Sequence, residues 1–144
     1  MRILSPAGDA FIQGFETLRL VGYADEGGIP TAGWGHTGAD VSVGTAYDLL
    51  QCQVWFRQDT QHAEAVVDGT APLSCTQNQF DALVSFAYNV GCGAYLHSTL
   101  LNLLKAGDSA GAAAQLLLWD HVGGVQSDGL LRRRTAEQAL FNKT

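Results

Sequence analysis

Apolar residues recur at helical spacing along most of the chain. The clearest run lies on one face of a single helix: Phe80, Leu83, Val84, Ala87 and Val90. Thr76 and Gln79 precede this run at the spacing of a capping box, and Gly91 follows it at the position where helices commonly end. We therefore predict a central, buried helix between Thr76 and Gly91.

A second amphipathic segment is longer. Thr45, with Asp48 three residues later, could cap its start, and Gly69 could end it. Its apolar positions also recur at helical spacing: Leu49, Cys52, Phe56, Ala63 and Val66. The pattern predicts one long helix from Thr45 to about Asp68.

Shorter helices are indicated by similar signals over residues 6–16, 99–106, 109–119 and 132–141. Ser5 and Pro6 form a cap and first-turn pair for the first of these helices. Ser98 opens the second helix, and Asp108 or Ser109 opens the third. The segments 40–44 and 123–128 carry the weakest signals, so we expect them to be loops.

One β-hairpin is predicted between the first helix and the long one. Gly22 to Asp25 forms its first strand, residues 26–30 its turn, and Thr31 to Gly35 its second strand. On this register Asp25 and Thr31 face each other. Thr31 shares its face with Gly33 and Gly35, because residues on a strand alternate between faces. That face would be open enough to admit a sugar.

Glu16, Asp25 and Thr31 are the residues with the most informative chemistry. Two carboxyl groups that hold different protonation states at one bond are typical of enzymes that cleave glycosidic linkages. Taken singly, Glu16 could be a solvated charge, Asp25 a turn residue and Thr31 a β-branched strand residue. Those interpretations explain each residue alone and leave their joint spacing unexplained.

Composition limits the alternatives. The chain has 144 residues, 47% of them apolar and 15% charged, which fits one soluble domain over residues 1–144. Its net charge is −6 and it has only eight Lys and Arg residues, so a nucleic-acid partner is excluded.

No apolar run reaches the roughly 20 residues of a membrane span, and the first fifteen residues lack the apolar core of a signal peptide. We expect the protein to accumulate in the cytoplasm.

The cysteines and one glycine-rich stretch have simple interpretations. Cys52, Cys75 and Cys92 are an odd number, so we expect unpaired thiols, and Cys92 with His97 is too sparse for a metal site. Residues 33–38 match the G-x-G-x-x-G pattern of nucleotide-binding proteins. A hairpin strand precedes them and no helix follows at once, so the match is a false positive.

The spacing of Glu16, Asp25 and Thr31, E-x8-D-x5-T, resembles that of the phage-type lysozymes, the endolysin muramidases of glycoside hydrolase family 24. The resemblance continues through residues 33–37, 56–59, 76–91 and 129–134, and Glu137. It covers nearly the whole chain. It implies a mainly α (α+β) fold with two lobes, a small hairpin lobe and a larger helical lobe, joined by the long helix.

The resemblance also implies supporting residues. It places His36 beside Asp59, in a role that we interpret as structural. It places an arginine beside the catalytic glutamate, and Arg133 has the better register among three adjoining arginines. Asn89 and Trp119 become candidate residues of the substrate cleft.

The function implied is hydrolysis of the β-1,4 bond between N-acetylmuramic acid and N-acetylglucosamine in bacterial peptidoglycan, for host lysis. Glu16 would be the general acid, Asp25 would activate water, and Thr31 would hold that water. A held water favours inversion, for which the two carboxyl groups lie about 6.5 to 9.5 Å apart rather than about 5 to 5.5 Å. The reaction needs no cofactor or metal.

Two rival functions remain open. A lytic transglycosylase cuts the same bond without water, and a non-catalytic wall-binding module cuts nothing. The complete triplet argues against both. We expect a monomer that acts on the cell wall, and a holin-type partner that releases it from the host cytoplasm.

Overall fold

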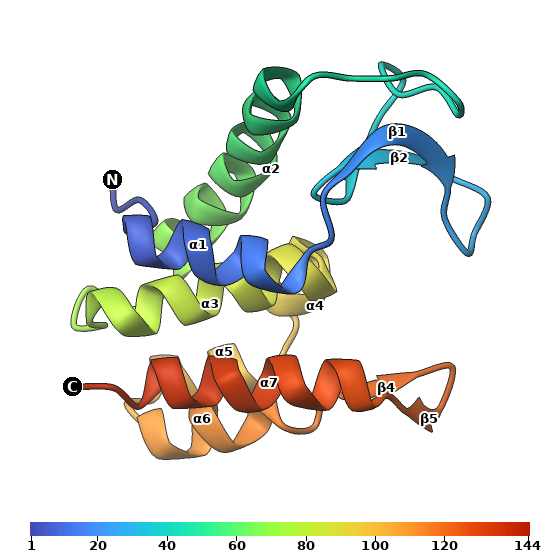
Figure 1. Cartoon of the computed structure of the whole chain (residues 1–144). Helices are drawn as coiled ribbons and strands as arrows, with labels where there is room; N and C mark the ends of the chain where they lie inside the picture. The colour runs from blue at the N-terminus through green and yellow to red at the C-terminus, as the bar shows by residue number, and fades with distance from the viewer. The chain divides into compact units, whose positions relative to one another are not determined.

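The computed structural model describes all 144 residues, as seven helices and two small antiparallel sheets (Figure 1). The chain divides into two compact units. The sheet unit comprises residues 9–62, and the helical unit comprises residues 1–8 and 63–144. A mainly helical fold with a small antiparallel sheet is therefore confirmed, with the sheet of the predicted hairpin in one unit and most of the helices in the other.

The sheet unit is built on three strands in the order β1-β2-β3: β1 (Arg19–Ala24), β2 (Pro30–Gly33) and β3 (His36–Thr37). Thr31 pairs with Tyr23 on one side and with Thr37 on the other. The predicted pairing of Asp25 with Thr31 is therefore wrong. Asp25 lies just beyond β1, where its backbone N–H donates to the carbonyl of Ile29 at 3.0 Å and begins the turn.

Packing against the helix that carries Cys52 buries Gly33, one residue of the face that was predicted to be open, whereas Gly35 on that face stays exposed. Gly33 is buried, has a φ of 63°, and lies so close to Cys52 that an added Cβ would stand 3.4 Å from the cysteine Cβ. The positive φ favours glycine there. The core of the unit gathers around this contact: Ala32, Val41, Cys52 and Trp55, with Leu18, Trp34 and Tyr47 packed against it.

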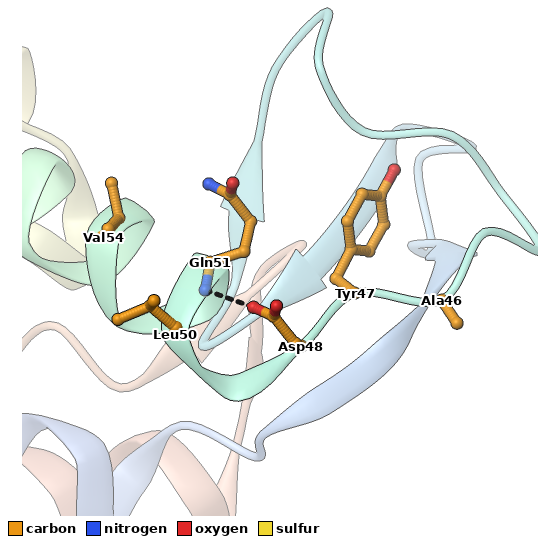
Figure 2. A pocket seen from close by; sticks show the side chains of 6 residues that line it. All are labelled: Ala46, Tyr47, Asp48, Leu50, Gln51 and Val54. Carbon is orange, nitrogen blue, oxygen red and sulfur yellow. Dashed lines mark hydrogen bonds between the residues drawn. The ribbon is translucent and has the colours of Figure 1, made fainter.

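The long helix α2 (Leu49–Thr70), green in Figure 1, begins four residues later than predicted. Asp48 caps it, because its Oδ1 accepts the backbone N–H of Gln51 at 2.7 Å, the dashed line in Figure 2. Thr45 instead pairs with β1, its carbonyl accepting the N–H of Gly22 at 2.9 Å. Thr45 therefore pairs with the sheet and does not cap the helix, although the sequence around it has a capping pattern.

The end of α2 also differs from the prediction. The helix passes through Gly69 and ends at Thr70, and the N–H of Ala71 still donates to Val67 at 2.8 Å. Pro72 then follows, a residue that has no N–H to donate and disfavours helical geometry in the residue before it. Proline, rather than the predicted glycine, marks this helix end.

The central helix of the helical unit, α3 (Gln77–Val90), forms as predicted. Both hydrogen bonds of the capping box between Thr76 and Gln79 are present, residues 80–87 are buried, and Gly91 has a φ of 94°. The helix packs against α7 (Asp128–Phe141). The predicted helix between Thr76 and Gly91 is confirmed.

The first and fifth helices are also confirmed. α1 (Pro6–Phe15) begins after Ser5, whose Oγ accepts the N–H of Gly8 at 3.0 Å. α5 (Thr99–Lys105) begins after Ser98, whose Oγ accepts the N–H of Leu101 at 3.1 Å. In both places a serine satisfies an N–H that has no partner within the helix.

Other elements depart from the prediction. α6 (Ser109–Leu116) ends three residues before Trp119, and α7 begins at Asp128 rather than at Arg132, because the hydroxyl of Ser127 caps it. The sequence did not predict the short helix α4 (Cys92–Leu96) or the hairpin of β4 (His121–Val122) and β5 (Val125–Gln126). The three cysteines are unpaired, as expected. None of the helices combines the length and the apolar character that crossing a membrane requires.

Candidate functional site

Glu16 is the first residue after α1, and its backbone N–H donates to the carbonyl of Ile12 at 3.2 Å. Its half-buried side chain lies beside Gly35, since a Cβ built on Gly35 would stand 3.5 Å from Oε2 of the carboxylate. Gly35 also has a φ of 83°, a conformation that other residues adopt at a cost. The positive φ therefore favours glycine at position 35, and this glycine lies beside the Glu16 carboxylate.

Asp25 has a structural use as well as a candidate chemical one. Its Oδ1 accepts the backbone N–H groups of Gly27 and Ile29, each at 2.8 Å, and so holds the turn between β1 and β2. This is the Asx geometry in which aspartate favours turns. Asp25 is thus a turn residue through its Oδ1. The second oxygen, Oδ2, takes no part in those two bonds.

Thr31 sits on the middle strand of the sheet, with only 4% of its surface exposed. Its hydroxyl donates to the carbonyl of Ile29 at 3.0 Å. A hydroxyl has one proton and two lone pairs, so in this arrangement Thr31 Oγ1 can accept a hydrogen bond from another molecule. Tyr23 lies on the same face, directly opposite Thr31, with the guanidinium of Arg19 4.4 Å from its ring centroid.

His36 pairs with Asp59 as expected, with 2.9 Å between Nδ1 and Oδ2. The sequence missed a second partner, Asp40, whose Oδ1 lies 3.2 Å from Nε2 of His36. The hydrogen bond from His36, with a further one from Trp55, lowers the pKa of Asp40. The His36 ring also stacks on Trp55, with 4.7 Å between centroids. These contacts tie His36 to its neighbours on both ring nitrogens, which fits a structural role.

In the helical unit a buried cluster surrounds Glu137. Its carboxylate accepts from Ser85 Oγ at 2.7 Å, from Arg133 Nε at 3.2 Å and from Arg134 Nη1 at 2.5 Å. Burial raises the pKa of Glu137, and the guanidinium of Arg134 acts against that rise. The pKa of Arg134 is lowered by its burial. The cluster fixes both arginines on the inner face of α7.

The three adjoining arginines differ in burial. Arg132 is exposed, whereas Arg133 is 4% exposed and Arg134 is fully buried. Arg133 donates to Glu137 and to the carbonyl of Ser85. Glu16 belongs to the sheet unit, so the pairing of Arg133 with Glu16 stays a prediction.

Asn89 and Trp119, the two candidate cleft residues, line one pocket of the helical unit. Its volume is about 540 Å³, and its lining residues are Asn89, Val90, Leu118, Trp119, His121 and Leu130. The side-chain oxygen of Asn89 accepts from Arg134, so the buried cluster orients its amide. Trp119 packs edge to face on Phe86, with 5.3 Å between centroids, so it serves the core as well as the pocket. The sequence did not predict a role for His121, because the glycine-rich segment that follows it was interpreted as a loop.

Comparison with known proteins identifies one family. The family model described as phage lysozyme matches residues 13–137. The endolysin of Bacillus phage PZA is 44% identical over 144 residues, covering 96% of this chain and 55% of that protein. The chain therefore spans about half the length of the Bacillus phage relatives that it matches.

Two solved structures are similar over nearly their whole length. The muramidase domain of SpmX from Asticaccaulis excentricus has a TM-score of 0.92 and 30% identity, with 100% of both chains covered. The endolysin from Escherichia coli O157:H7 phage FAHEc1 has a TM-score of 0.90 and 35% identity, covering 99% of this chain and 94% of that one.

Proposed function

Because the chain belongs to the phage lysozyme family, we propose that it is an endolysin muramidase. It hydrolyses the β-1,4 bond between N-acetylmuramic acid and N-acetylglucosamine in bacterial peptidoglycan, and it inverts the anomeric carbon. The sheet unit carries the three residues that act on the bond: Glu16, Asp25 and Thr31.

Glu16 is the general acid. It gives its proton to the oxygen that leaves the anomeric carbon, so that the departing sugar leaves as a neutral alcohol. Its half-buried side chain lies at the end of α1, beside Gly35. Arg133 is the proposed partner of its carboxylate.

The observation that carries the proposal is how Asp25 and Thr31 use their hydrogen-bonding capacity. The proton of Thr31 is committed to the carbonyl of Ile29, and Oδ1 of Asp25 is committed to two backbone N–H groups. A water between them donates one proton to Thr31 Oγ1 and the other to Asp25 Oδ2. Its lone pair is then directed at the anomeric carbon, on the face opposite to the leaving group, and attack from that face inverts a β linkage.

The pocket around Asn89 and Trp119 supports substrate binding. A pocket with apolar walls and a few oriented polar groups is the usual form of a ligand site. Trp119 supplies an aromatic surface, and the amide of Asn89 is held by Arg134. We assign this pocket to the glycan or to the groups attached to it.

The deciding experiment is product analysis on purified peptidoglycan. Hydrolysis leaves muramic acid with a free reducing end, whereas transglycosylation leaves a 1,6-anhydro ring that is lighter by one water. Mass spectrometry separates these products, and NMR before mutarotation identifies the first anomer. We expect reducing ends in the α configuration. Anhydro ends would refute hydrolysis, an initial β product would refute the roles of Thr31 and Asp25, and no released fragment would indicate a binding module.

A matched pair of variants tests the acid. Glu16→Gln removes the proton donor, so the rate of reducing-end release should fall by about 10² to 10⁴-fold. Glu26→Gln removes an exposed carboxyl in the β1–β2 turn and should leave the rate unchanged. Wild-type activity in a folded Glu16→Gln protein would reject the assignment. Release by a holin-type partner and the monomeric state stay predictions.

A further inference from the structure

His121 lies on β4 and lines the same pocket as Asn89 and Trp119. Its Nδ1 lies 2.6 Å from Oδ1 of Asp120, and its side chain is 53% exposed whereas that of Asp120 is 5% exposed. The two residues are therefore a buried carboxylate and a half-exposed imidazole at the edge of a cavity. Neither residue has a part in the roles assigned so far.

Asp120 is itself held firmly. Its Oδ2 accepts from Gln126 Nε2 at 2.7 Å, and its backbone carbonyl accepts the N–H of Ser127 at 2.7 Å. The bonds from Gln126 and His121 lower the pKa of Asp120, so it stays an acceptor at neutral pH. Asp120 thus contacts β4 and β5 through its side chain and the start of α7 through its backbone carbonyl.

This arrangement sets the tautomer of His121. A carboxylate accepts and does not donate, so the Nδ1 of His121 must carry the proton. In the neutral imidazole the other nitrogen, Nε2, is then a hydrogen-bond acceptor. Asp120 acts here as a positioning residue, because it works through His121.

Asn89 offers the complementary group. Its Oδ1 accepts from Arg134, which leaves the NH₂ of its side chain as the donor. The pocket therefore combines an N–H donor from Asn89 and a nitrogen acceptor from His121. Its other lining residues are apolar: Val90, Leu118, Trp119 and Leu130.

We propose that Asn89 and His121 bind a secondary amide of the wall polymer, its C=O at Asn89 and its N–H at His121 Nε2, with the attached carbons against Trp119. A carboxylate would lack the N–H, and a hydrocarbon would leave both polar groups without partners. The inference rests on the proposed function. Peptidoglycan carries such amides in two places, the N-acetyl groups of its sugars and the peptide stems of its muramic acid.

The test is a binding measurement that needs no catalysis. The ligand is the disaccharide N-acetylglucosaminyl-N-acetylmuramic acid with its peptide, which lacks the bond that the enzyme cuts. The same disaccharide without peptide, and a chitin disaccharide, separate the two sources of the amide. Affinity is measured by calorimetry or by NMR titration for the wild type, for His121→Ala, and for the control His97→Ala, an exposed histidine outside the pocket.

We expect His121→Ala to weaken binding about five- to tenfold, which corresponds to one hydrogen bond, and His97→Ala to leave it unchanged. If the peptide provides the amide, only the peptide-bearing ligand loses affinity. If the N-acetyl group provides it, all three ligands do. Unchanged affinity of His121→Ala for all three ligands would overturn the proposal.

A spectroscopic measurement tests Asp120 separately. Nitrogen-15 NMR of the wild type should show the neutral ring of His121 protonated at Nδ1, and protonation at Nε2 would overturn the inference. Asp120→Ala should lose this tautomer preference, and adding His121→Ala to it should weaken binding no further. Wall clearing separates a failure of the proposed amide site from a failure of the proposed function. Clearing that proceeds with no dependence of binding on His121 refutes only the amide site, whereas absent clearing refutes the proposed function.

Discussion

Asp25 gives the sharpest test of the site, because its two carboxylate oxygens have separable uses. Asp25→Asn keeps a side-chain oxygen that can accept the N–H groups of Gly27 and Ile29, so the turn should survive. It replaces the oxygen assigned to water by an NH₂ group, which cannot take a proton. Asp25→Ala removes both. The Asn variant should therefore lose catalysis alone, and the Ala variant should lose catalysis and stability together.

The expected magnitudes follow from the two 2.8 Å bonds. Each is a charge-assisted bond in an exposed turn, so together they contribute about 1 to 2 kcal/mol to the free energy of unfolding. For a chain of 144 residues that loss lowers Tm by about 3 to 6 °C in Asp25→Ala. In both variants the rate should fall by about 10² to 10⁴-fold, the usual contribution of a general base.

The assay combines thermal unfolding by circular dichroism with initial rates of reducing-end release. Glu26→Ala is the matched control, since it removes an exposed carboxyl from the same turn and should change neither quantity. An Asp25→Asn protein with wild-type activity would show that Asp25 serves only the turn. An Asp25→Ala protein with unchanged Tm would show that the turn does not depend on its carboxylate.

Three further outcomes are expected. The folded-state pKa of Asp40 is depressed, so its contribution to stability is present above its unfolded pKa of about 3.9 and is lost as pH falls through the lowered value. Urea unfolding should accordingly show Asp40→Asn destabilised at pH 5.5, with the difference from wild type shrinking as the pH is lowered. Glu137→Gln leaves two buried guanidinium groups without their carboxylate and should cost about 3 to 5 kcal/mol in the same assay, and a loss below about 1 kcal/mol would contradict the role of the cluster. Burial raises the pKa of the Cys52 thiol, so a thiol reagent should modify it only after unfolding, and rapid modification of all three cysteines in the native protein would contradict its packing.

The sequence predicts the helical unit best where the signal is local. The capping box of Thr76 and Gln79 needs only residues that are neighbours along the chain, and both of its bonds form. Thr45 carries a similar cap signal and fails, because its carbonyl pairs with the N–H of Gly22 in β1. That competitor lies 23 residues away, and no pattern at Thr45 itself reveals it.

The β4–β5 hairpin was missed although its signal is local. Gly123 and Gly124 have φ values of 57° and 80° and stand between Val122 and Val125. Two glycines between β-branched residues are a typical two-residue hairpin connection, because such turns require positive φ at both positions. The segment was interpreted as a loop from its glycines alone, so His121 and its place in the pocket were not foreseen.

The spacing of Asp25 and Thr31 has a structural cause that the sequence could not show. Ile29 contacts both residues: its N–H donates to Oδ1 of Asp25, and its carbonyl accepts the proton of Thr31. The backbone of Ile29 thus determines which carboxylate oxygen of Asp25, and which lone pairs of the Thr31 hydroxyl, are left for water. The turn must bring the backbone of residue 29 back to the side chains of Asp25 and Thr31. This requirement fixes the number of residues between Asp25 and Thr31 at five. The side chain of Ile29 is exposed, so its backbone, rather than its identity, supplies this constraint.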